Sequence, residues 1–252
     1  MPGPVCTALV TGGGARIGSA IVQDLAAHGW GLAIHANSST AEAETEAARI
    51  IGDGGRAAVI QADLTDLDAV HAILPEANDR LGPVTLLVNN AGIFLKDAVG
   101  ELDAATWETQ LAVNLRAPVF LAQAFAAQLP DGEEGNIVNI IDHRVWKLRP
   151  DMTSYTLAKS ALWTATRTLA QALAPKIRVN GIGPGPVLPN QNEGEAGFAV
   201  EVDGTLLKRQ VDLADFGRAI RFLVETRSMT GQMLALDSGQ HLAWRTPDIL
   251  ST

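Results

Sequence analysis

Tyr155 and Lys159 are the residues whose types and spacing could do chemistry. Tyr155 is the only tyrosine in the 252 residues, and Lys159 follows it by four positions. Side chains four positions apart share one face of a helix, and a nearby ammonium lowers the pKa of a phenol by favouring the phenolate. The pair therefore predicts a proton donor near neutral pH, as an enzyme that reduces a polar double bond requires. Taken alone, the two residues could also be surface neighbours that share a helix face by accident.

The rest of the chain alternates short apolar runs with Ala-rich amphipathic stretches, which predicts strands and helices in turn. The expected strands are Val5–Val10, Leu32–His35, Ala57–Gln61, Thr85–Val88, Ile137–Ile141, Ile177–Val179 and Met233–Leu236. The expected helices are 16–28, 41–51, 67–81, 104–128, 153–174 and 213–225, and Ser39 with Glu42 predicts a capping box at the second of them. This order predicts an α/β fold: a doubly wound parallel sheet of about seven strands, with helices on both faces and ligands at the carboxyl ends of the strands.

Composition limits the classes of function. The formal charge of −9 argues against a nucleic-acid partner, because phosphate binding needs a basic face. No apolar run reaches the ~18 residues needed to cross a membrane, and the start of the chain lacks a secretory pattern. The single Cys6 fits a reducing compartment, so we expect a cytoplasmic protein of one domain, residues 1–252. The histidines are scattered without metal-ligand spacing, which predicts no metal site.

A glycine loop follows the first expected strand, running from Thr11 through Gly12, Gly13 and Gly14 to Gly18. Glycines let backbone amides approach a pyrophosphate, which then lies at the positive end of the next helix. Glycine clusters also form ordinary turns, but the position between the first strand and the first helix favours a dinucleotide.

The end of the second expected strand favours NADPH over NADH. His35-Ala36-Asn37-Ser38-Ser39 contains no acidic residue, which would bind a ribose 2′-hydroxyl and repel a 2′-phosphate. Asn37, Ser38 and Ser39 can donate hydrogen bonds to a phosphate, and Arg16 adds a cation. At the end of the third strand, Asp63-Leu64 could hold the adenine, although Asp63 fits a turn or helix cap equally well.

The glycines and prolines of Gly183–Pro189 predict that neither a strand nor a helix continues through this segment. The polar stretch up to about Gly204 lacks periodicity. A loop this long is usually a binding loop or is disordered. We expect a substrate lid at about 186–204.

With these motifs in order, the chain resembles the short-chain dehydrogenase/reductase family over nearly its whole length. The resemblance rests on the glycine loop, Asn89-Asn90-Ala91-Gly92, Asn114, Tyr155 with Lys159, Arg178-Val179-Asn180, Pro184-Gly185 and Asp237-Ser238-Gly239. It implies a Rossmann-like domain, assembled as a homotetramer or homodimer. It also implies that Lys159 holds the nicotinamide ribose and that Asn114 supports a water-linked proton path. The cofactor site implied by these motifs and the features above comprises Gly12, Arg16, Ile17, Gly18, His35, Asn37, Ser38, Ser39, Asp63, Leu64, Asn90, Ala91, Gly92, Tyr155, Lys159, Pro184, Gly185 and Val187.

Three departures from the common family pattern resemble the pteridine reductases and bacterial dihydromonapterin reductases, which also reduce dihydrofolate weakly. Arg16 replaces a glycine, Asp142 occupies the place of the catalytic serine, and Phe94 follows Asn90-Ala91-Gly92-Ile93. The pteridine reductases of that branch stack the pterin between the nicotinamide and an aromatic ring placed like Phe94. Gly92 stands where some pteridine reductases carry a serine that contacts the substrate.

These residues also make chemical sense for a pterin or a folate-like small molecule. A carboxylate repels the negative charge that develops on a carbonyl oxygen, whereas Asp142 can bind ring N–H groups, and burial would raise its pKa. Phe94 offers a face for stacking, and Arg16 could contact cofactor phosphates and the pterin carbonyl together. Each has a plainer interpretation: a strand-end turn for Asp142, core packing for Phe94, and phosphate or solvent contact alone for Arg16.

Tyr155 is the expected acid, with Lys159, Asp142 and Asn114 completing the catalytic set. The first alternative is an NADPH-dependent carbonyl reductase of the same fold, acting for example on 3-oxoacyl thioesters. The second, from another class, is an NADP-binding sensor or scaffold without catalysis.

Overall fold

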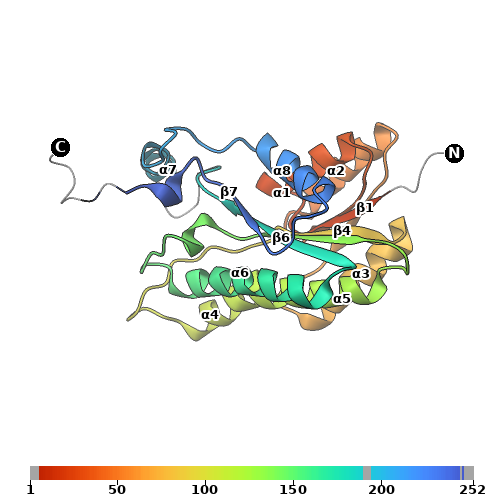
Figure 1. The fold of residues 1–252 in the computed structure, drawn as a ribbon, viewed down its shortest axis with the longest axis horizontal. Helices are drawn as coiled ribbons and strands as arrows, with labels where there is room; N and C mark the ends of the chain where they lie inside the picture. Colours follow the sequence, from red (N-terminus) through yellow and green to blue (C-terminus); the bar gives the residue numbers. More distant parts are fainter. Residues whose placement is uncertain (1–5, 190–193, 245, 247–252) are drawn as a thin grey trace.

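Seven parallel strands form one sheet in the order β3-β2-β1-β4-β5-β6-β7 (Figure 1). The computed structural model describes residues 6–189, 194–244 and 246. The strands are β1 (Thr7–Val10), β2 (Gly31–Ala36), β3 (Ala57–Gln61), β4 (Val84–Asn89), β5 (Gly135–Ile140), β6 (Ile177–Pro184) and β7 (Met233–Leu236). The predicted doubly wound α/β fold with seven strands is confirmed.

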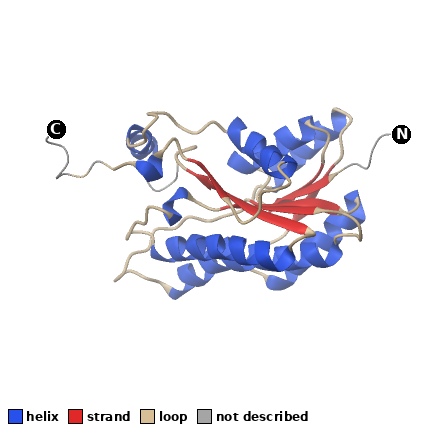
Figure 2. Ribbon diagram, in the orientation of Figure 1, coloured by secondary structure: helices blue, strands red, loops and turns tan. Residues whose placement is uncertain are grey.

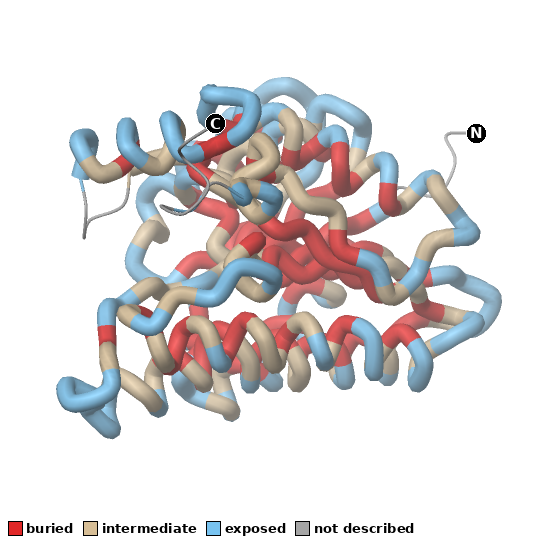
Figure 3. The backbone as a smooth tube through the Cα atoms, turned by 60° about the vertical axis from the view of Figure 1, so that its left-hand side comes forward, coloured by how far each residue is buried: buried red, intermediate tan, exposed pale blue. Residues whose placement is uncertain are grey.

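Helices cover both faces of the sheet (Figure 2). One face carries α1 (Arg16–Ala27), α2 (Thr40–Gly52) and α8 (Ala214–Glu225); the other carries α3 (Leu67–Leu81), α4 (Ala104–Leu111), α5 (Ala117–Gln128) and α6 (Thr153–Leu173). Successive strand residues point to opposite faces, so Val10 joins the core under α1 and Leu9 the core under α3 and α5. Figure 3 shows the sheet as the buried layer between half-exposed helices.

The strand order reverses between β1 and β4, which are neighbours in the sheet. Connections leaving such a pair turn to opposite faces and open a crevice at the carboxyl ends of the strands. The glycine loop leaves β1 there, and Asn90-Ala91-Gly92 leaves β4. The sheet therefore brings together two motifs that lie far apart in the sequence.

The helix predicted at 104–128 is interrupted by a π-helical turn, Ala112–Arg116, which separates α4 from α5. Pro118 has no N–H to give the carbonyl of Asn114 four residues earlier, so a regular α-helix cannot form there. Such turns are frequent at functional sites, and this one carries the buried Asn114. The single-helix prediction was wrong at this point.

Two further predictions were wrong around the expected lid. Strand β6 continues through Gly183 to Pro184, because both residues pair with β7; proline at the last strand position loses no needed donor. The predicted irregular lid at 186–204 contains a helix, α7 (Gly194–Asp203), although residues 190–193 lie outside the described part. Only Phe198 of α7 is buried, so the helix has little apolar periodicity to recognise. Its role as a lid stays a prediction.

The capping box was also wrong: Ser39 precedes α2 but its side chain makes no capping hydrogen bond. In the part of the chain that the structure describes, no helix combines the length and apolar character needed to span a bilayer.

Candidate active site

A cavity of about 520 Å³ opens at the carboxyl ends of the strands, within the ~300–1,000 Å³ typical of ligand sites. Every residue that the sequence predicts for the site lines this cavity except Asn114. The lining also includes four polar or charged residues that were not predicted for the site, which are His143, Arg144, Glu201 and Gln240.

The glycine loop is packed too closely for side chains. A Cβ on Gly18 would lie 2.0 Å from the Gly12 carbonyl oxygen, and one on Gly12, where φ is +63°, would lie 3.0 Å from the Ala91 Cα. The Asn90 amide donates to the Thr11 and Gly12 carbonyls at 2.8 and 3.2 Å, which fixes the loop to the end of β4. Ala15, the residue before α1, makes no side-chain cap, so within the described residues the first-turn amides remain available to an anion. The cradle fits a dinucleotide pyrophosphate.

His35, on β2, holds the glycine loop in place. Its Nδ1 accepts from the Gly12 N–H at 3.2 Å, so its Nε2 carries the proton and donates to the Ala62 carbonyl at 3.1 Å. Burial lowers the pKa of His35 to about 4, which keeps the ring neutral. The side chain thus positions the loop after β1 against the end of β3.

The residues after β2 lie at one end of the cavity. Asn37 and Ser38 are exposed there, with no carboxylate among residues 35–39. Arg16 adopts a φ of +52°, a left-handed backbone that explains why glycine is usual at this position. Its guanidinium donates to the Pro189 carbonyl at 3.1 Å, so it links the glycine loop to the segment after β6. Asp63 forms a turn, because its side chain accepts a hydrogen bond from the Thr65 N–H at 2.8 Å. Asp63 and Leu64 both line the cavity.

Tyr155 lies in the first turn of α6 and donates its hydroxyl to Asp142 Oδ2 at 2.7 Å. Burial, the negative charge of Asp142 and this hydrogen bond raise the pKa of Tyr155 well above its usual value. The expectation that Lys159 lowers this pKa was wrong, because the phenol is buried against a carboxylate. Tyr155 is therefore a protonated acid across the neutral range.

Asp142 follows β5 and is only 18% exposed at its side chain. Burial acts to raise its pKa, but hydrogen bonds from His143, the Arg144 N–H and Tyr155 hold the pKa below its ordinary value. Burial acts in the predicted direction, but the net shift of the pKa is downward, so the expectation that the acid form of Asp142 becomes more available was wrong. Asp142 is a carboxylate with three neighbouring donors.

Lys159 is 4% exposed and donates to the Ile140 carbonyl at 2.9 Å. Burial lowers the pKa of its ammonium to about 8, with the negative charge of Asp142 opposing the shift. Its Nζ lies 5.9 Å from the centre of the Tyr155 ring.

Asn114 lies behind the cavity wall, fully buried. Its side chain accepts from the Ile93 N–H at 3.2 Å and donates to the Ile93 carbonyl at 3.0 Å. A Cβ on Gly92 would lie 3.0 Å from Asn114 Oδ1 and 3.5 Å from Lys159 Nζ, so a side chain at this position would crowd both polar groups. Asn114 positions the loop that carries Phe94.

Phe94 stands edge-to-face against Tyr155, with ring centres 4.8 Å apart and planes at 81°. Both rings line the cavity beside Lys159. The predicted aromatic wall is thus placed next to the predicted acid.

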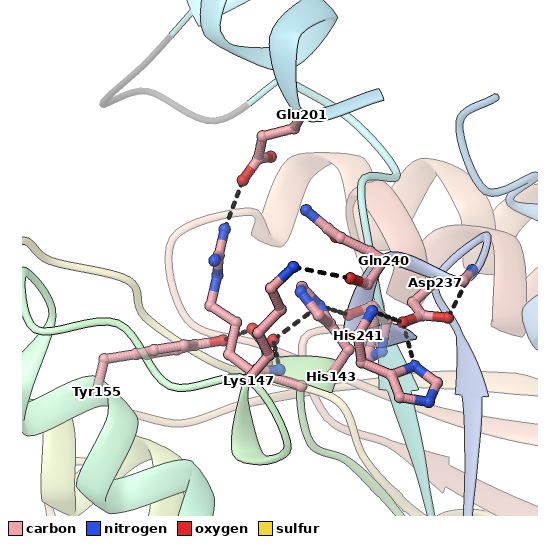
Figure 4. Close-up of polar contacts among 11 residues, drawn as sticks. His143, Lys147, Tyr155, Glu201, Asp237, Gln240 and His241 are labelled. Carbon is pink, nitrogen blue, oxygen red and sulfur yellow. Dashed lines mark hydrogen bonds and ion pairs between the residues drawn. The ribbon is translucent and has the colours of Figure 1, made fainter. Parts of the chain in front are cut away.

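Sequence reasoning missed the polar residues opposite Tyr155 (Figure 4). Arg144 and Glu201 form an ion pair of 2.5 Å, with Glu201 extending from α7 toward the loop after β5. His143 looked like an ordinary loop histidine, yet it is 3% exposed and lines the cavity. The one sequence feature that could have assigned His143 to the site was its position directly after Asp142. Among the described residues, no group of three or more acidic, histidine or cysteine side chains could hold a metal ion.

The short chain dehydrogenase profile matches residues 6–196, which include the glycine loop, Tyr155 and Lys159. This chain belongs to the short-chain dehydrogenase family. The crystal structure of FolM alternative dihydrofolate reductase 1 from Brucella suis in complex with NADP is similar, with 55% sequence identity and a TM-score of 0.91. The similarity covers 97% of this chain and 98% of that one.

Two curated relatives carry other names. A probable galactose dehydrogenase GalD from Rhizobium meliloti is 35% identical over 241 residues, covering 92% of this chain and 93% of that protein. A 3-oxoacyl-[acyl-carrier-protein] reductase from Synechocystis sp. is 27% identical over 242 residues, covering 92% of this chain and 95% of that protein. The family membership therefore rests on most of the chain, whereas the substrate has to be argued from the site.

Proposed function

We propose that this chain is an NADPH-dependent reductase that converts a dihydropterin of the dihydromonapterin type, and more weakly dihydrofolate, to the tetrahydropterin. The observation that carries the proposal is the carboxylate of Asp142 bound to the Tyr155 hydroxyl. The 55% identity to the Brucella suis alternative dihydrofolate reductase supports it.

NADPH is the proposed cofactor and supplies the hydride when it is bound. The first-turn amides of α1 would hold the pyrophosphate, and Asn37, Ser38 and Arg16 would hold the 2′-phosphate. Ser39, Asp63 and Leu64 complete that end, while Asn90, Ala91, Gly92, Pro184, Gly185 and Val187 line the end nearest Tyr155 and Lys159. The absence of a carboxylate from residues 35–39 favours the phosphorylated cofactor.

The protein's part in the reaction follows from its charges. Phe94 packs against one face of the pterin ring, and Asp142 accepts hydrogen bonds from ring N–H groups. Negative charge develops on the ring nitrogen beside the reduced carbon, which makes that nitrogen a strong base. Tyr155 then donates its proton to that nitrogen, and the ammonium of Lys159 balances the phenolate. Asn114 holds the loop of Phe94 in place through Ile93.

A carbonyl reductase is the second candidate, favoured by the similarity to the Synechocystis enzyme. Its transition state places negative charge on an oxygen, which needs a neutral or positive donor. The lowered pKa of Asp142 puts a carboxylate at that place. The same contact therefore argues for a ring nitrogen over a ketone oxygen.

The test is NADPH oxidation by the purified enzyme with dihydromonapterin, dihydrobiopterin, dihydrofolate and an acetoacetyl thioester. We expect kcat/KM for a dihydropterin to exceed that for the thioester at least about tenfold, and Tyr155→Phe to reduce kcat about a hundredfold or more. A higher kcat/KM with the thioester would instead support the carbonyl reductase. NADPH binding without turnover of any of these compounds would support a sensor or scaffold.

We also propose a homodimer or homotetramer in the cytoplasm. Exposed apolar side chains beside α4 and α6 support the assembly, including Leu102 at 45% and Leu157 at 49% exposure. The lone Cys6, which is free, supports a reducing compartment. Light scattering on the purified protein tests the assembly, since a monomer at all concentrations contradicts it.

A further inference from the structure

His143 is a buried ring at the substrate end of the cavity whose proton position is fixed by its contacts. It begins the short 3-10 turn after β5, His143–Val145. Its Nδ1 lies 2.8 Å from the Pro184 carbonyl oxygen and 3.2 Å from Asp142 Oδ1. A carbonyl oxygen can only accept, so Nδ1 carries the hydrogen and points it between these two oxygens.

The other ring nitrogen has no partner. In the neutral ring with a hydrogen on Nδ1, Nε2 holds a lone pair. This atom is buried and makes no hydrogen bond to any described residue. A buried acceptor without a partner costs about 1–3 kcal/mol, so native structures seldom keep one without a ligand or water to satisfy it.

Gln240 provides a second acceptor of the same kind. It begins the short turn Gln240–Leu242 and lines the same cavity, and its Oε1 is buried with no partner among the described residues. Figure 4 shows His143 and Gln240 on the side of the site opposite Tyr155. Two residues of the cavity lining, across from the proton donor, thus each carry a buried polar atom without a partner among the described residues.

We propose that His143 Nε2 accepts a hydrogen bond from an N–H of the pyrimidine half of the pterin, while Nδ1–H positions the Asp142 carboxylate. This inference rests on the proposed function and deepens it. A pterin offers N–H donors at the exocyclic amino group and at N3, whereas a 3-oxoacyl thioester has none beside its ketone. His143 is thus a substrate-contacting residue that selects for the donor-rich edge of the ring.

The two roles of His143 can be separated by substitution. Asparagine places an amide N–H near Nδ1 and so keeps the tie to Asp142 and Pro184, but it removes the acceptor at Nε2. Glutamine keeps a polar atom near Nε2 and removes the donor at Nδ1. His71, which is exposed on α3 away from the cavity, gives the matched control His71→Asn.

In steady-state kinetics with NADPH and dihydromonapterin, we expect His143→Asn to raise KM about threefold to tenfold with a smaller change in kcat. We expect His143→Gln to reduce kcat more than it raises KM, because Asp142 loses a positioning donor. His71→Asn should match the wild type. Melting temperature and NADPH affinity, measured for every variant, show whether the fold is kept. An unchanged KM in a folded His143→Asn enzyme overturns the inference.

A second experiment needs no variant to fold. Wild-type enzyme is assayed with two dihydropterin analogues, one lacking the exocyclic amino group and one methylated at N3. We expect one analogue to show a KM raised severalfold, and a folded His143→Asn enzyme to lose most of that difference. If neither analogue differs from dihydromonapterin, His143 does not read an N–H and the inference fails. Wild-type enzyme that turns over no dihydropterin at all contradicts the proposed function itself, which is a distinct result.

Discussion

Tyr155 donates its hydroxyl hydrogen to Asp142 at 2.7 Å, so the candidate acid of this site is held by a carboxylate. The contact joins the first turn of α6 to the loop after β5. It keeps the phenol protonated and places a negative charge where a ketone oxygen would need a neutral donor. The relationship raises the pKa of Tyr155, and we expect it also to govern the choice of substrate.

Removing the charge of Asp142 should make Tyr155 more acidic. Tyr155 is the only tyrosine, so phenolate absorbance during an alkaline titration reports this residue alone. We expect the wild-type midpoint to lie above the ~10 of free tyrosine, and Asp142→Asn to lower it because the repelling charge is gone. Circular dichroism at each pH confirms that the fold persists. Equal midpoints in the two folded proteins would show that Asp142 does not set the acidity.

The alkaline side of the pH–rate profile should belong to Lys159. Its pKa is lowered to about 8, so the ammonium loses its proton as pH rises through that value, while Tyr155 stays protonated. We therefore expect kcat/KM for the dihydropterin to fall above about pH 8. In Lys159→Arg the fall should move to higher pH, because guanidinium keeps its charge. The idea fails if the wild-type profile stays flat to pH 10 or if the arginine variant falls at the same pH.

Much of this fold could be predicted because the strands are uniformly apolar and the glycine loop follows the first of them. The predicted bounds of β3, β7 and α3 match the structure. The π-helical turn could not be read from apolar periodicity, since its cause is one missing N–H at Pro118 that frees a carbonyl in an otherwise apolar helix. Helix α7 was missed because it buries only Phe198.

For the site, residue types predicted which side chains meet but not their charge states. Tyr155 and Lys159 do share one face of α6 beside the cavity. Their pKa values depend on burial and on Asp142, which is thirteen positions before Tyr155 in the sequence and in contact with it only after folding. His143 was missed for the same reason, because its hydrogen-bond partner Pro184 lies at the end of β6 and is far from it in the sequence.

Cofactor choice should follow the residues after β2. Asn37→Asp would place a carboxylate at the exposed end of that strand, where it can bind a ribose 2′-hydroxyl and repel a 2′-phosphate. We expect the ratio of kcat/KM for NADPH to that for NADH to fall by about tenfold or more, a change of ~1.4 kcal/mol. Asn37→Gln serves as the uncharged control. Wild-type enzyme that uses NADH as well as NADPH would contradict the assignment of this end of the site.

The close packing of the glycine loop should make Gly18→Ala severe. The new methyl group would lie 2.0 Å from the Gly12 carbonyl oxygen, so the loop must move. We expect NADPH affinity, measured by fluorescence titration, to weaken more than about tenfold, with a lower melting temperature. Gly52→Ala, at the exposed end of α2 where a Cβ meets nothing within 4 Å, should bind normally and gain up to about 1 kcal/mol of stability. Equal NADPH affinity in the two variants would remove the loop from cofactor binding.

The most direct test of the account is the substrate preference of Asp142→Ser beside the wild type. For each enzyme, kcat/KM is measured with dihydromonapterin and with an acetoacetyl thioester under saturating NADPH. We predict that the wild type prefers the dihydropterin and that Asp142→Ser lowers this preference about a hundredfold, because a hydroxyl replaces the repelling carboxylate beside Tyr155. A wild type that prefers the thioester, or a serine variant with an unchanged preference, would contradict the claim that Asp142 makes this site a dihydropterin reductase.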